Sequence, residues 1–170
     1  QATRTRNYFS PDIHIPSVVL QWQLRPNTKL QLTNSAVLGK RNSILFDKPS
    51  TTADTINATT LQYNNRQVDI DQFNSYTSEL RLLQQYGRNN KAHVLAAGIQ
   101  YMHNDLHRTQ LGKGTTGTDY DLNLLDPNWG RDLHFKTKNL ALFAENKIQL
   151  TNRFSISTGV RMETGITHLT

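Results

Sequence analysis

The chain has 170 residues, of which 36% are hydrophobic, and its mean hydropathy is −0.61. Its 19 Lys and Arg exceed its 13 Asp and Glu, but this surplus is spread out and forms no basic stripe with interleaved aromatics, so a nucleic-acid partner is excluded. The absence of cysteine excludes disulfides and thiolate metal sites, and no apolar run of about eighteen residues predicts a membrane-spanning helix.

The first predicted element is a hairpin of two strands, residues 17–24 and 28–40. Arg25-Pro26-Asn27 predicts the tight turn between them, because Pro fixes φ and suits a turn. The apolar residues that share one face are Leu20, Trp22 and Leu24 in the first strand and Leu30, Leu32, Ala36 and Leu38 in the second. Polar residues occupy the alternate positions, as expected for strands with one apolar face.

Alternation weakens over residues 41–74, which are rich in Thr, Asn and Asp and predict a long loop. A structureless connection of this length is uncommon in a compact domain unless it is functional. Alternation resumes over residues 76–86 and again over 91–104, with a predicted turn at residues 87–90. These two segments predict a second hairpin.

A second long loop is predicted over residues 105–134, followed by a third hairpin over 140–163. In this hairpin Thr151-Asn152-Arg153 separates two alternating runs. The sequence therefore predicts six strands whose connections alternate strictly between short and long. No segment shows a sustained helical period.

Three features favour lipid over a protein core as the neighbour of the apolar face. The predicted strands, at about ten residues or more, suit a tilted span of the bilayer, and transmembrane barrels alternate short turns with long outer loops. Trp22, Tyr86 and Phe154 lie near short turns on the apolar face. Tyr76 shares that face with Tyr86, and a tilted strand of this length spans roughly 26 Å of membrane.

The predicted fold class is accordingly all-β: an antiparallel, up-and-down transmembrane β-barrel segment with residues 1–170 in one barrel domain. Charged residues on the polar face, such as Glu79, Arg81 and Arg161, would line the lumen. Six strands alone would leave two bare edges in lipid, so the chain is expected to be part of a larger barrel. The alternative is a soluble β-sandwich that acts as a binding or adhesion module through its long loops.

Several segments resemble TonB-dependent outer-membrane receptors. The late hairpin "ALFAENKIQLTNRFSISTGVRME" is similar to a hairpin of that family in which an "FAE" strand precedes a strand with Gly and Arg, here Phe143-Ala144-Glu145 with Gly159 and Arg161. The segments that resemble the ferric-citrate branch are "NSAVLGKRNSILFD", "FNSYTSELRLLQQYG" and "HVLAAGIQYMHNDLHR".

The resemblance implies an outer-membrane barrel of twenty-two strands around an N-terminal plug, energised by the TonB complex. Neither the plug nor a TonB-contacting segment is expected within this chain, so the chain alone should not transport. The implied partners are a ferric chelate, outer-membrane lipid and, through the plug, the TonB complex. The resemblance implies a receptor and not an enzyme, and no cofactor is expected.

Ferric citrate and most ferric siderophores are anionic or rich in oxygen, so their capture would use Arg and Lys at the mouth of the lumen. The candidate ligand-binding residues in and beside the two long loops are Arg41, Arg66, Arg108, Lys113 and Arg131. For each of them, solvation of a loop or contact with lipopolysaccharide is the alternative.

Other chemistry has little support in the sequence. His103 and His107 have the spacing of a helical metal pair, but they lie where a strand is expected to enter a loop. Residues 112–118, "GKGTTGT", lack the spacing of a phosphate-binding loop. Glu145 and Glu163 fit a barrel wall better than a catalytic pair. No catalytic residue and no metal ligand is therefore predicted.

Overall fold

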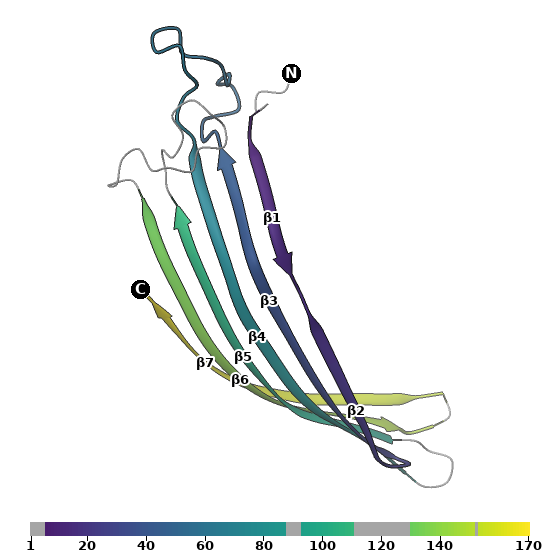
Figure 1. The fold of residues 1–170 in the computed structure, drawn as a ribbon. Helices are drawn as coiled ribbons and strands as arrows, with labels where there is room; N and C mark the ends of the chain where they lie inside the picture. Colours follow the sequence, from purple (N-terminus) through teal and green to yellow (C-terminus); the bar gives the residue numbers. More distant parts are fainter. Residues whose placement is uncertain (1–5, 88–92, 111–129, 152) are drawn as a thin grey trace.

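The computed structural model describes residues 6–87, 93–110, 130–151 and 153–170. It contains one antiparallel sheet, in which each strand from β3 to β6 pairs with the next along the chain (Figure 1). The strands are β1 Tyr8–His14, β2 Ser17–Arg25, β3 Thr28–Leu45, β4 Gln67–Tyr86, β5 His93–Gln110, β6 Arg131–Gln149 and β7 Ser155–Leu169. This all-β, up-and-down arrangement confirms the predicted fold class.

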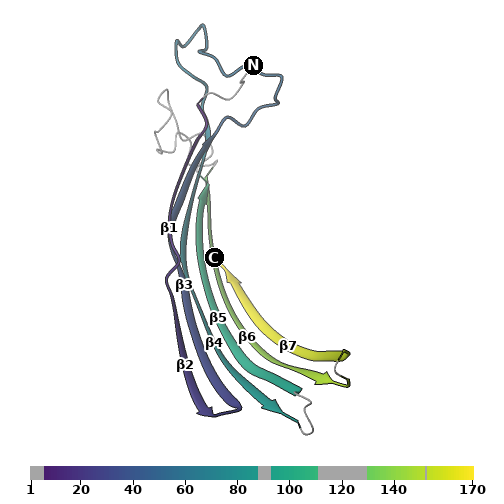
Figure 2. The same cartoon turned by 90° about the vertical axis from the view of Figure 1, so that its right-hand side faces the viewer.

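The strands curve together as one layer, with the 46–66 segment at one end and the β2–β3 turn at the other (Figure 2). The described ranges form a single sheet, and a sandwich needs two packed sheets. The soluble β-sandwich alternative therefore does not describe this fold. No helix in the described part of the chain is long and apolar enough to cross a membrane.

β1 was not predicted from the sequence. β1 and β2 both pair with β3, one after the other, so together they make one crossing of the sheet. Pro16 lies at the break between them, and its carbonyl oxygen accepts a hydrogen bond from the Ala36 N–H at 3.0 Å. Pro11 lies within β1, where a proline is tolerated because an edge strand has N–H groups without ladder partners.

The predicted bounds of both long loops are wrong. β3 continues to Leu45 and β4 begins at Gln67, so much of the predicted 41–74 loop is strand, and the connection covers residues 46–66. Likewise residues 105–110 belong to β5 and residues 131–134 to β6. Residues 111–129, with most of the second predicted loop, lie outside the described residues, as do residues 88–90 of one predicted turn.

Register between strands places like residues side by side. Leu32 pairs with Leu80 on β4, and Ile99 on β5 pairs with Leu142 on β6. These rows form an apolar face whose side chains are largely exposed, with Leu142 at 52%. Among the described residues, the buried hydrophobic side chains are only Ile44, Phe46, Val68 and Ala141. Within the described ranges the apolar face thus has no protein core against it, as expected for a surface that meets lipid.

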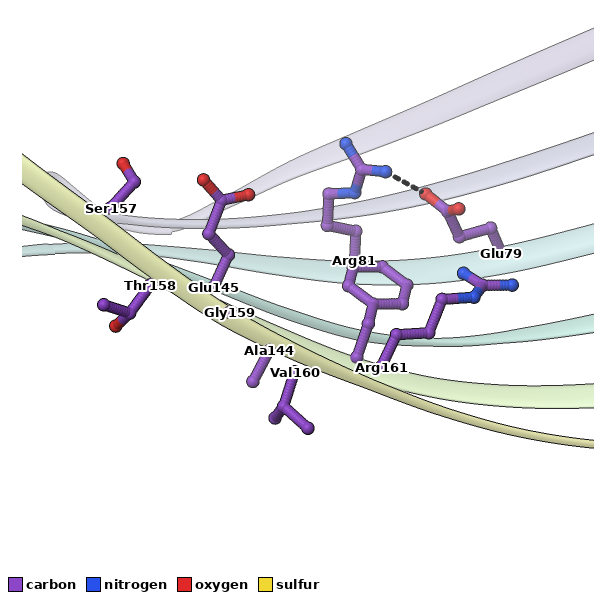
Figure 3. Close-up of a pocket in the computed structure, with 10 residues that line it drawn as sticks. Glu79, Arg81, Ala144, Glu145, Ser157, Thr158, Gly159, Val160 and Arg161 are labelled. Atoms are coloured by element: carbon purple, nitrogen blue, oxygen red, sulfur yellow. Dashed lines mark ion pairs between the residues drawn. The ribbon is translucent and has the colours of Figure 1, made fainter.

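The other face of the sheet is polar. Figure 3 shows Glu79, Arg81, Glu145 and Arg161 on one side of the strands and Ala144, Thr158 and Val160 on the opposite side. This division follows from the strand period of two residues. The sheet therefore has one continuous polar face. The candidate ligand-binding residues that belong to strands lie on this face.

Candidate functional site

Two of the predicted ligand-binding residues meet on the polar face at a buried carboxylate. Arg41 on β3 and Arg108 on β5 both lie directly opposite Asp71 on β4, so the three residues form a row across the sheet. Arg108 donates to Asp71 from Nε, at 2.7 Å to Oδ1, and from Nη2, at 3.1 Å to Oδ2. Arg41 donates to Oδ2 from its own Nη2.

The row keeps two cations accessible around one buried anion. The side chain of Asp71 is 1% exposed, whereas those of Arg41 and Arg108 are 37% and 43% exposed. Asp71 lies beyond the apolar band, five residues from Tyr76 on β4. Burial raises the pKa of its carboxyl, but the hydrogen bonds and charges of Arg108 and Arg41 outweigh this, and the pKa lies below its usual value.

The remaining predicted residues are placed differently. Arg131 begins β6 opposite Gln110, which puts it on the polar face one row from Arg108. Lys113 lies outside the described residues. The structure thus places Arg41, Arg108 and Arg131 at the same end of one surface.

Arg66 does not share this surface, which corrects the expectation that it faces a ligand. Its side chain is 1% exposed, and its Nη2 lies 2.8 Å from Oδ1 of Asp54, itself 2% exposed. The rings of Phe46 and Tyr63 lie 5.6 and 5.8 Å from its guanidinium carbon. Arg66 therefore stabilises the 46–66 segment from within.

Asp71 was missed because its segment was assigned to a loop. Residues 67–71, "QVDID", alternate polar and apolar residues, which is the signal of a half-buried strand. Continuing β4 through this segment would have placed Asp71 on the same face as Glu79 and Arg81. Only the register with β3 and β5 shows that two arginines flank it.

A second polar network crosses four strands nearer the short turns. Gln100 on β5 donates to Glu79 at 3.1 Å and accepts from Arg161 on β7 at 3.0 Å. Arg161 also donates to Glu163 at 2.9 Å, and Asn139 on β6 donates to the other oxygen of Glu163 at 2.7 Å. With Arg81, whose Nη2 lies 2.7 Å from Oε1 of Glu79, these residues form a continuous, charge-balanced polar wall.

Small residues allow this network to span the sheet. Ala141 on β6 separates Gln100 from the β7 side chains and is fully buried, so its methyl leaves room for the hydrogen bond above it. Gly98 lies beneath the ring of Phe143, and a Cβ at this position would lie 2.6 Å from the ring. Arg81 in turn lies 5.4 Å from the centre of that ring, beside a hollow of about 410 Å³ (Figure 3).

The histidines lie on the opposite, outward face. His103 and His107 are inside β5, not at a strand end. His107 stacks on His134 of β6 with ring centres 5.0 Å apart, and each ring contacts a carboxylate, Asp132 and Asp105 respectively. Within the described ranges, no three His, Cys, Asp or Glu side chains are arranged to hold a metal ion.

Comparison with known protein families matches the chain, over residues 1–167, to the model described as TonB dependent receptor-like, beta-barrel. The chain belongs to the TonB-dependent receptor β-barrel family. Comparisons with curated protein sequences and with solved structures give no match. Members of this family are outer-membrane receptors and transporters and not enzymes.

Membership of the TonB-dependent receptor family gives the two faces of the sheet their environments. In a barrel of this kind the apolar face meets lipid and the polar face lines the lumen. The row of Arg41, Asp71 and Arg108 and the network around Gln100 are then both lumen-facing. This explains how so many charged side chains can occupy one face of a membrane-spanning sheet.

Proposed function

We propose that this chain forms the part of an outer-membrane receptor wall that captures a ferric chelate, either ferric citrate or another siderophore. Import would then require the plug of the full-length receptor and the TonB complex that acts on it. The resemblance of several segments to the ferric-citrate branch supports citrate as the first chelate to test.

The observation that carries this proposal is the row of Arg41, Asp71 and Arg108. It presents two part-exposed guanidinium groups at fixed positions on the polar face, with Arg131 one row away. Guanidinium groups bind carboxylate oxygens in a planar, two-point geometry, which suits citrate. Asp71 keeps both side chains in place, and the row retains one net positive charge.

The Arg41→Gln, Asp71→Asn, Arg108→Gln triple variant of the full-length receptor tests this proposal. It removes both guanidiniums without leaving the Asp71 charge buried and unpaired. We expect radio-iron citrate to bind outer membranes at least tenfold more weakly, since charge-assisted hydrogen bonds contribute about 1.5–3 kcal/mol each. The measurement is saturation binding of radio-iron citrate, with other ferric chelates as competitors.

Arg153→Gln is the matched control, because it also removes one net positive charge but lies beside the short β6–β7 turn. It should bind ferric citrate like the wild type. The heat-dependent mobility of each receptor on gels reports whether its barrel is assembled. Unchanged ferric-citrate binding by an assembled triple variant would show that the chelate is captured elsewhere. If the wild type binds another ferric chelate and not ferric citrate, the identity of the proposed ligand is wrong.

A further inference from the structure

One row of the polar face is apolar from one edge of the sheet to the other. It runs from β1 to β7 through successive register partners, and Gly39 on β3 is its only position without a side chain. The members of this apolar row that carry side chains are Ile13, Phe73, Leu106, Phe135 and Leu169. None of the five is buried among the described residues, so the row is open to the lumen.

The apolar row is separate from the lipid-facing band. Phe73 follows Asp71 by two residues on β4, so the row lies on the same face as the candidate site. The neighbouring row toward the short turns is polar again, and in it Ser75 donates to the side-chain oxygen of Asn104 at 2.6 Å. An exposed apolar strip framed by polar residues marks an interaction site, and ligand pockets combine apolar walls with a few polar groups.

The apolar row and the two arginines of the candidate site form one surface. The guanidinium carbon of Arg41 lies 6.0 Å from the centre of the Phe73 ring. Gly39, the partner of Phe73 on β3, has no side chain that could cover this ring from its register position. Leu106 separates Phe73 from Phe135 by two strand spacings, which is roughly 10 Å. A ligand with several rings can therefore contact both phenylalanines while it reaches the guanidiniums.

We propose that this surface binds a ferric chelate whose iron ligands are aryl oxygens, as in a catecholate or phenolate, an inference that rests on the proposed function and names its substrate class. The rings lie against Phe73 and Phe135, and the anionic oxygens face Arg41 and Arg108. Citrate has carboxylates and a hydroxyl but no apolar surface, so it engages only the guanidiniums. An aryl chelate makes charge-assisted hydrogen bonds and ring contacts together, and this surface offers the groups for both.

A hexadentate ferric tricatecholate is the probe, compared with ferric citrate by saturation binding to outer membranes that carry the full-length receptor. The wild type should bind the tricatecholate about tenfold more tightly than citrate, because the ring contacts add to the ionic ones. The Phe73→Gln, Phe135→Gln variant should lose this preference and bind citrate as the wild type does. The Phe73→Tyr, Phe135→Tyr variant should keep the preference, because it retains both rings. None of these substitutions changes the charge of the protein, so the preference reports ring contact.

Leu83→Gln with Phe143→Gln is the matched control, because it removes two apolar side chains from the polar face nearer the short turns. It should keep the wild-type preference, and heat-dependent mobility on gels shows whether each barrel is assembled. Equal affinity of the wild type for the two chelates, or the full preference in the assembled Phe73→Gln, Phe135→Gln variant, would overturn the inference and leave the proposed function standing. Parallel loss of both chelates in that variant would show that the row positions the protein and not the ligand, which also overturns the inference. An assembled wild type that binds neither chelate would contradict the proposed function and this inference with it.

Discussion

Gly39→Ala is expected to detach β1 from β3 in the full-length receptor. Gly39 has φ of +139°, a conformation that residues with a Cβ rarely adopt, and it pairs with Ile13 of β1. A Cβ at this position would overlap the carbonyl oxygen of Asp12 and approach the Ile13 Cα to 2.9 Å. Since both contacts are backbone, relief requires the strands to separate, and the backbone strain alone costs about 1–3 kcal/mol.

Hydrogen exchange measures this effect locally. Amide protection should fall over β1, Tyr8–His14, and at those residues of 38–44 whose amides point toward β1 and not toward β4, while β5 and β6 keep theirs. Gly165→Ala is the control, because a Cβ there would lie 3.2 Å from a side-chain atom, Asn139 Nδ2, and no closer than 3.4 Å to any backbone atom of the neighbouring strand. If the β1 amides are as well protected from exchange in Gly39→Ala as in Gly165→Ala, the close approach of β1 and β3 is not required for their pairing.

The sequence predicts the hairpins well where one face of the sheet is apolar. The alternation of Leu30 and Leu32, and of Leu80 and Leu82, is enough to identify these parts of β3 and β4 as strands, and Pro26 marks the turn before β3. A period of two residues carries this information only while one face avoids water. Beyond the apolar band, over residues 40–43, polar residues occupy both faces, and the signal is lost there.

This loss explains the misplaced loop bounds. Residues 40–43, "KRNS", have no apolar member, yet they continue β3 because their backbone groups pair with residues 69–72 of β4. Backbone ladders are independent of side-chain hydrophobicity, so composition suggested a loop where the structure has a strand. β1 was missed for a related reason, since Pro11 and Pro16 interrupt a segment that is not strictly alternating.

The sequence predicts two residues of the candidate site and misses the third. Arg41 and Arg108 could be chosen because cations near a lumen mouth suit an anionic ligand, but Asp71 becomes visible only with the register. Arg66 shows that position along the chain does not by itself identify a ligand-binding residue. Its partner Asp54 is 12 residues away within an irregular segment, and no periodic signal predicts that the two are buried together.

Asp54→Ala should disorder the 46–66 connection while the sheet stays assembled. Arg66 and Asp54 are 1% and 2% exposed, so removing the carboxylate takes away the anion that accepts both hydrogen bonds from the buried Arg66 Nη2. Breaking a buried pair from one side costs about 3–5 kcal/mol, which exceeds what a short irregular segment can absorb. The Ile56–Tyr63 bridge and the turn held by Asn57 should open with it.

The double variant Asp54→Leu, Arg66→Met separates the charge effect from lost packing. It removes both charges and keeps side-chain volume, and such replacements are often neutral or stabilising. Limited proteolysis of the full-length receptor in outer membranes should therefore cut the 46–66 connection rapidly in Asp54→Ala and slowly in the double variant. Equal resistance of Asp54→Ala and the wild type would show that packing of Arg66 against Phe46 and Tyr63 orders this connection without the ion pair.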